Sequence, residues 1–134
     1  MILPTSTTVA VADGATLRLF RNMGVKPGVH LVEIETPVLA PANSGSGARH
    51  HSGSANPDLR RHAEDDFAAA TARFLNKQSL DGKIEHLVIV ADPRSLGEMR
   101  KHFHADLTGK ILGEFAKDLS RRPLEDIASL IAEA

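Results

Sequence analysis

The sequence has no cysteine, tryptophan or tyrosine among its 134 residues. Without cysteine there are no disulfide bonds, thiolate nucleophiles or cysteine-based zinc sites, and the chain fits a reducing compartment. The only benzene-type rings belong to five phenylalanines, so platforms on which nucleic-acid bases stack are scarce.

The sequence also has no excess of one charge sign and no long hydrophobic run. Its 16 Lys and Arg balance 17 Asp and Glu, so a nucleic-acid partner would have to be held by a local basic patch. No apolar run approaches the ~18 residues that span a bilayer, and the N-terminus lacks a secretory signal pattern. We therefore predict a cytoplasmic protein with no membrane contact and a single domain over residues 1–134. The oligomeric state is not predicted.

Three β-strands are expected in the first part of the chain. Residues 7–13 are β-branched and apolar on both faces, which is typical of a central strand. Asp13-Gly14 then indicates a tight hairpin, and residues 15–20 alternate in polarity as a strand that pairs back. Residues 29–35 predict a third, more exposed strand.

Residues 37–56 are rich in glycine, serine and histidine and predict a flexible loop. After it, helices and strands alternate, and each of the first two helices begins with a capping residue followed by proline. The predicted elements are a helix over 57–77, a strand over 86–91, a helix from Asp92-Pro93, a strand over 109–118 and a helix from Pro123. The apolar stripe of the first of these helices is predicted to be Leu59, Ala63, Phe67, Ala70 and Phe74.

The order β-β-β-α-β-α-β-α predicts an α/β fold of the ribonuclease H-like (βββαβαβα) arrangement, a mixed five-stranded sheet with helices on both faces. In this arrangement strands one, three, four and five are parallel, so their carboxyl ends share one edge. Open sheets of this kind bind ligands at that edge. The sequence therefore predicts a binding site there, bordered by the loop over residues 37–56.

Two metal sites and an anion site are candidates at this edge. Asp13, Glu64 and Asp92 are candidate Mg²⁺ ligands; alternatively they are a turn residue, a solvated helix residue and an N-cap. No cofactor is predicted apart from this candidate Mg²⁺ ion. The candidate phosphate ligands are Arg49, Arg60, Arg61, Arg94, Arg100 and Lys101, although Arg100 and Lys101 also fit the wet face of an amphipathic helix.

A histidine group is the second metal candidate. His50 and His51, with His62, are candidate zinc or nickel ligands, or simply solvated side chains. Acyl-serine chemistry is not expected, because the sequence has no G-x-S-x-G nucleophile motif.

Four segments together resemble the bacterial host attachment protein family, in order and in spacing: VADGATLRLFRN, LRRHAEDDFAAATARFLN, HLVIVADPRSLGEMRKHF and AKDLSRRPLEDIASLI. That family is named for attachment of bacteria to host cells. It is similar to the middle domain of archaeal and eukaryotic peptide-chain release factors, which has the ribonuclease H-like topology. The release-factor loop carries Gly-Gly-Gln, whereas the one glutamine here is Gln78 near a helix end, so the resemblance does not imply peptidyl-tRNA hydrolysis by that route.

The resemblance also implies site residues, which mostly fall on the edge where the strands end. The implied ligand or phosphate contacts are Arg18, Arg94, Arg100 and Lys117. The candidates for orienting a ligand, or for catalysis, are His62, Glu64 and Asp118.

Three functions remain open from the sequence. The first is a release-factor-like domain that binds RNA, the ribosome or another translation-associated partner. The second is a divalent-metal phosphodiesterase or nuclease that uses the acidic residues. The third is a non-enzymatic regulatory protein that affects attachment to host cells. Whether the chain is an enzyme is therefore left open.

Overall fold

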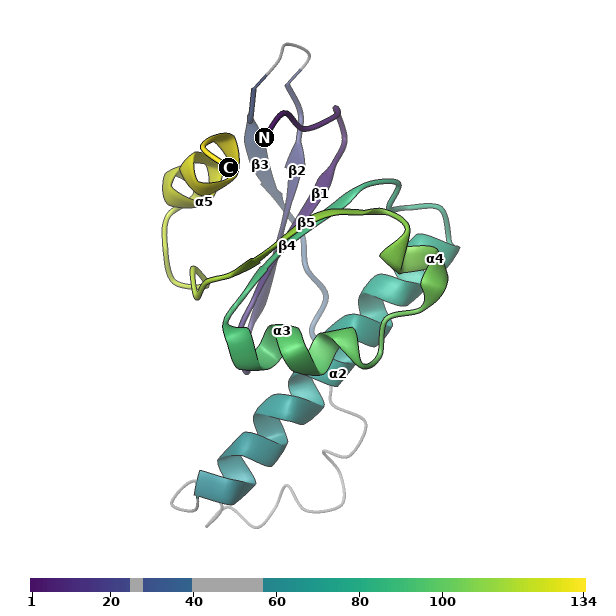
Figure 1. The fold of residues 1–134 in the computed structure, drawn as a ribbon, viewed down its shortest axis with the longest axis vertical. Coiled ribbons are helices and arrows are strands. Elements are labelled where there is room, and N and C mark those ends of the chain that lie inside the picture. Colours follow the sequence, from purple (N-terminus) through teal and green to yellow (C-terminus); the bar gives the residue numbers. More distant parts are fainter. Residues whose placement is uncertain (25–27, 40–56) are drawn as a thin grey trace.

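A mixed five-stranded β-sheet forms the centre of the fold (Figure 1). The computed structural model describes residues 1–24, 28–39 and 57–134. The strands are β1 (Thr8–Ala12), β2 (Leu17–Asn22), β3 (Leu31–Ile34), β4 (Leu87–Ala91) and β5 (Ile111–Ala116). Their order across the sheet is β3-β2-β1-β4-β5.

Strand polarity agrees with the sequence prediction. β1 pairs antiparallel with β2, and β2 pairs antiparallel with β3. β1 pairs parallel with β4, and β4 pairs parallel with β5. The carboxyl ends of β1, β3, β4 and β5 therefore lie at one end of the sheet, which we call the carboxyl edge. The α/β class with a mixed five-stranded sheet is confirmed, and the topology is compatible with the ribonuclease H-like arrangement.

Among the described residues, four helices follow the β1–β3 meander. They are α2 (Pro57–Leu80), α3 (Pro93–Arg100), α4 (Ala105–Thr108) and α5 (Leu124–Ala132). The predicted cap at Asp92 is confirmed, because its side chain accepts a hydrogen bond from the backbone N–H of Ser95 at 3.1 Å. The short helix α4 was not predicted; it buries Leu107.

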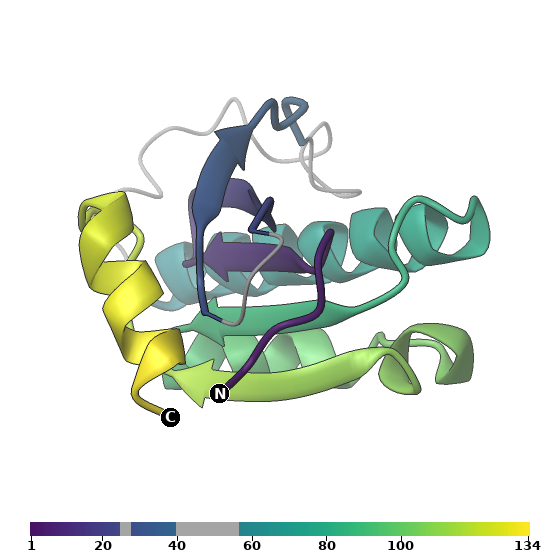
Figure 2. The ribbon, with the colours of Figure 1, turned by 90° about the horizontal axis from the view of Figure 1, so that it is seen from above.

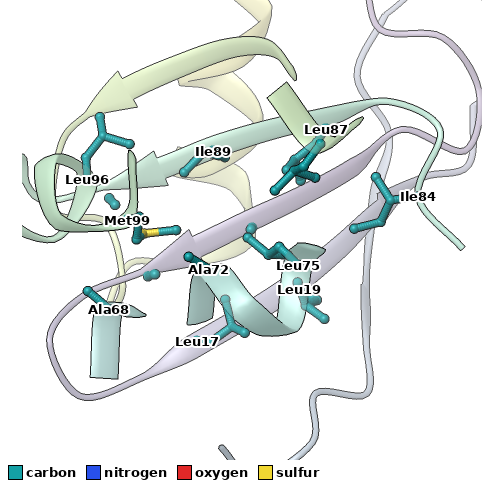
Figure 3. Close-up of a cluster of buried hydrophobic side chains, with 14 residues drawn as sticks. Leu17, Leu19, Ala68, Ala72, Leu75, Ile84, Leu87, Ile89, Leu96 and Met99 are labelled. Atoms are coloured by element: carbon teal, nitrogen blue, oxygen red, sulfur yellow. The ribbon is translucent and has the colours of Figure 1, made fainter. Parts of the chain in front are cut away.

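The helices cover both faces of the sheet, as predicted. α2, α3 and α4 pack on one face, where the small side chains of Ala68 and Ala72 in α2 lie close to the sheet and Leu75 fills the space beside them (Figure 3). α5 packs on the other face, where Ile127 and Ile131 are fully buried. Figure 2 shows α5 separated from α2 and α3 by the strands. The two cores fix the sheet between the helices.

The predicted apolar stripe of α2 is wrong at its first two positions. Leu59 is 51% exposed and Ala63 is also exposed. The N-terminal half of α2 extends beyond the carboxyl edge, so no sheet lies beneath it (Figure 1). Periodicity identifies an apolar face but does not tell where the neighbouring sheet ends.

Some predictions lie outside the described residues. The predicted loop over 37–56 is outside them from residue 40 onward, and so are Arg49, His50 and His51. Within the described part of the chain, no helix has both the length and the apolar character needed to cross a membrane.

Candidate functional site

Three aspartates follow neighbouring parallel strands at the carboxyl edge. Asp13 follows β1, Asp92 follows β4 and Asp118 comes shortly after β5. Ala12 and Ala91 are partners in the β1–β4 ladder, so Asp13 and Asp92 leave adjacent strand ends. These residues are far apart in the sequence, and they lie at one edge because β1, β4 and β5 are parallel, as predicted.

Ser120 joins two of these aspartates. Its Oγ lies 2.7 Å from Asp13 Oδ2 and 2.8 Å from Asp118 Oδ1. The residue is only 7% exposed. A serine hydroxyl has one hydrogen, so it donates to one carboxylate at a time. Ser120 thereby ties the connection between β5 and α5 to the β1–β2 hairpin. Sequence reasoning missed this residue, because an isolated serine in no motif gives no signal of burial.

Hydrogen bonds at the hairpin stabilise the charged form of Asp13. Partial burial alone raises the pKa of its carboxyl group. Ser120 Oγ and the backbone N–H groups of Ala15 and Thr16 outweigh that effect, and the pKa of Asp13 lies below its ordinary value. The two N–H groups donate to Asp13 Oδ1, each at 2.7 Å, so the carboxylate closes the turn as well.

Replacing Asp13 by asparagine should weaken the fold in a pH-dependent way. A carboxyl group with a lowered pKa in the folded state contributes stability above its unfolded-state pKa, and this stability is lost as the pH falls through the folded-state value. The difference in unfolding free energy between wild type and Asp13→Asn is therefore expected to be largest at neutral pH and to shrink below about pH 4.

Urea unfolding across this pH range measures the difference. Glu85→Gln is the control, since Glu85 is exposed and has no hydrogen bond or ion pair among the described residues; its difference from wild type should stay near zero at every pH. A deficit of Asp13→Asn that is constant from neutral to acid pH would show that the charge of Asp13 does not stabilise the fold.

Helix α2 approaches the hairpin directly above Gly14. A Cβ atom on Gly14 would lie 2.6 Å from Cγ and 2.7 Å from Cβ of Glu64, which is too close for any real side chain. Glycine is therefore required here because Glu64 packs against the turn. This contact places Glu64 at the carboxyl edge, as predicted.

Arg94 binds Asp65 and so joins the first turn of α3 to α2. Its Nη2 lies 2.8 Å from Oδ2, and its Nε donates to Oδ1 at 3.2 Å. This two-point pairing fits the planar guanidinium and orients both side chains. Arg94 lies at the carboxyl edge as predicted, but an ion pair already engages its guanidinium. Asp65 was not predicted as its partner, because it stands in a run of three acids that gives no indication which one faces α3.

Arg18 is also engaged within the protein. Its Nε and Nη2 donate to the Glu33 carboxylate at 3.1 and 3.0 Å. Its Nη1 donates to the carbonyl oxygens of Arg122 at 2.8 Å and Ser120 at 3.3 Å, and the guanidinium carbon lies 4.9 Å from the centre of the Phe20 ring. Arg18 therefore fastens the β5–α5 connection to β2 and β3. These hydrogen bonds hold the pKa of Glu33 below its ordinary value.

Of two other predicted residues, Arg100 is placed differently and His62 pairs within its own helix. Arg100, at the end of α3, donates from Nε to Glu114 of β5 at 2.7 Å. Glu114 is the ladder partner of Ile89 in the middle of β4, so Arg100 lies away from the carboxyl edge. The side chain of His62 is 68% exposed, and its Nε2 lies 3.6 Å from Asp66 on the same helix.

The predicted Mg²⁺ ligands do not form a ready set of three. Among the described residues, no group of three or more histidine and acidic side chains is arranged to hold a metal ion. Both oxygens of Asp13 accept hydrogen bonds. Asp92 uses Oδ2 for the helix cap, and its Oδ1 is buried with no hydrogen-bond partner among the described residues. The Mg²⁺ site stays a sequence prediction.

Three exposed cationic side chains at the carboxyl edge make no hydrogen bond or ion pair with other described residues. We call them the free cations; they are Arg61, Lys117 and Arg121. Figure 1 shows the N-terminal half of α2, which carries Arg61, projecting at the bottom of the molecule, and the β5–α5 connection, which carries the other two, at the left of the sheet below α5.

Comparison with known proteins gives one family. The chain matches bacterial archaeo-eukaryotic release factor family 12 over residues 6–131, nearly its whole length. No curated protein matches it. The expected relation to release factors is confirmed, whereas the match says nothing about attachment to host cells, which stays a prediction. Because the match covers the whole sheet and the described helices as far as Ile131, the chain belongs to bacterial archaeo-eukaryotic release factor family 12.

Proposed function

We propose that this domain binds RNA, in a cytoplasmic and translation-associated setting, through its carboxyl edge. The observation that carries the proposal is the presence of three free cations, Arg61, Lys117 and Arg121, at the end of the sheet where open α/β sheets bind ligands. The family membership supports the translation-associated setting.

The other arginines of the edge have a different role in this proposal. Arg18 and Arg94 are held by Glu33 and Asp65, so they fix the geometry of the elements around the site. Lys117 and the two remaining free cations are then available for phosphate oxygens, which Arg and Lys bind well. His62, Glu64 and Asp118 border the same surface, and we propose binding there without a reaction.

Removing two of the free cations should weaken RNA binding. The double variant Arg61→Ala with Lys117→Ala is expected to lower the affinity for a fluorescently labelled RNA hairpin about tenfold at low salt. The slope of log K against log salt should fall by about 2, because each lost phosphate contact removes about 1 from it. Fluorescence anisotropy over a salt series measures both quantities.

A matched double variant separates this edge from general charge effects. Arg73→Ala with Lys83→Ala removes the same charge from exposed side chains in the body of α2 and in the α2–β4 connection. It should keep nearly the wild-type affinity and slope. Equal losses in both double variants, or a wild-type affinity that does not change with salt, would refute binding at the carboxyl edge.

A further inference from the structure

We infer that the RNA recognised at the carboxyl edge is a double helix, contacted through its phosphates and 2′-hydroxyl groups, and not a single strand held by its bases. This inference rests on the proposed function and specifies its ligand. Two features of the edge support it: the lack of free phenylalanine rings on which bases stack, and the convex shape of the projecting helix.

The phenylalanine side chains pack in or against the two hydrophobic cores. Proteins that hold single strands usually stack the bases on exposed aromatic rings. The chain has no Trp or Tyr, and its five Phe are the only such rings. Phe20 is fully buried, and the other four pack against a core: Phe67, Phe74, Phe103 and Phe115. None of these rings is free to stack on a base.

Some of the other flat groups of the edge are occupied as well. A guanidinium plane also stacks on bases, and those of Arg18 and Arg94 are fixed by two hydrogen bonds each to a carboxylate. The guanidinium groups of Arg61 and Arg121 are free within the described residues, and the proposed function assigns them to phosphate oxygens. Among the described residues of the edge, His62 keeps an exposed imidazole, on a helix that carries Arg61 beside it. One imidazole supports at most one stacked base.

The shape of the edge favours a groove as its binding surface. Residues 57–63 of α2 are all exposed and extend beyond the sheet (Figure 1), a length of roughly 10 Å at the rise of an α-helix. The contact of Glu64 with Gly14 and the pair of Asp65 with Arg94 hold this projection at its base. A fixed convex helix that carries the free cation Arg61 suits the wide, shallow minor groove of A-form RNA, which displays 2′-hydroxyl groups and is bordered by phosphates.

Competition between RNAs tests the inference. The full chain is bound to a labelled RNA hairpin with a long stem and challenged with the unlabelled hairpin, with oligo(U) of the same number of nucleotides, and with a DNA hairpin of the same sequence. We expect the RNA hairpin to compete about tenfold better than oligo(U), because phosphate spacing and groove shape are lost in a single strand. The DNA hairpin should compete less well than the RNA hairpin.

The outcomes distinguish failure of this inference from failure of the proposed RNA-binding function. Binding of oligo(U) as tight as that of the RNA hairpin, or a DNA hairpin that competes as well as the RNA hairpin, would overturn the inference and leave RNA or nucleic-acid binding intact. Binding of neither RNA would overturn both.

Discussion

Arg18→Lys is expected to lower the free energy of unfolding by about 2 kcal/mol, although the substitution keeps the positive charge. Lysine has a single nitrogen at its tip, so it does not reproduce the contacts that Arg18 makes in two directions. It loses the second hydrogen bond to Glu33 and those to the carbonyl oxygens of Ser120 and Arg122. The planar contact with the ring of Phe20 is also lost.

The expected cost is more than that of a surface ion pair. The side chain of Arg18 is only 24% exposed, and the carbonyl of Ser120 is partly buried, so water replaces the lost bonds poorly. Arg100→Lys is the matched control, because Arg100 also pairs with a glutamate but has a side chain that is 56% exposed. That control should lose less than about 1 kcal/mol.

Urea unfolding at neutral pH measures both variants, and RNA binding gives the second consequence. Because Arg18 holds the β5–α5 connection that carries Lys117 and Arg121, its loss should weaken hairpin binding in the folded variant. Unfolding midpoints of Arg18→Lys and Arg100→Lys that coincide would show that the carbonyl contacts of Arg18 add nothing to an ordinary ion pair.

The course of the sheet could be predicted from the sequence because its signals are local. Asp13-Gly14 indicated the hairpin, and the five residues of β1, like those of β4, are buried on both faces, as unbroken apolar runs predict. Proline after Asp92 located the start of α3. These elements determine the direction of each strand, and the strand directions place four carboxyl ends at one edge of the sheet. The sequence therefore also predicted that Asp13, Glu64 and Asp92 lie at this edge.

The roles of individual side chains at the edge were harder to predict. Arg18 and Arg94 were expected to meet phosphate, and the structure engages both with acids of the protein itself. Glu33 and Asp65 lie 15 and 29 residues from their partners, and nothing in the sequence specifies such a pairing. The exposure of Leu59 shows the same limitation, since periodicity is a local signal and the end of the sheet is a tertiary fact.

Asn22→Ala is expected to be the most destabilising single change considered, with a loss of about 3 kcal/mol. Asn22 is fully buried at the end of β2, opposite the carboxyl edge. Its Nδ2 donates to the carbonyl oxygens of Leu3 at 3.1 Å and Pro4 at 3.3 Å, and its Oδ1 accepts from the N–H of His30 at 2.8 Å. Alanine leaves three backbone groups without these partners, and unpaired buried groups cost more than the bonds themselves contribute.

Thr5→Ala is the control for this end of the fold. Thr5 Oγ1 donates to the carbonyl oxygen of Gly24 at 2.6 Å and joins the same two segments, but at the exposed surface. Water replaces that bond, so thermal or urea unfolding should show a loss below about 1 kcal/mol. A similar small loss for Asn22→Ala would mean that the buried amide is not what holds the N-terminal segment to the β2–β3 turn.

The pair Asn22→Ala and Arg18→Lys separates loss of stability from loss of the site. Both variants are destabilised, but Asn22 lies at the end of the sheet away from the free cations. At a temperature where both are folded, Asn22→Ala should bind the RNA hairpin as wild type does, whereas Arg18→Lys should bind it more weakly. If hairpin affinity instead followed stability in both variants, the carboxyl edge would not be the binding surface, because a distant core defect would then affect binding as much as a defect beside Lys117.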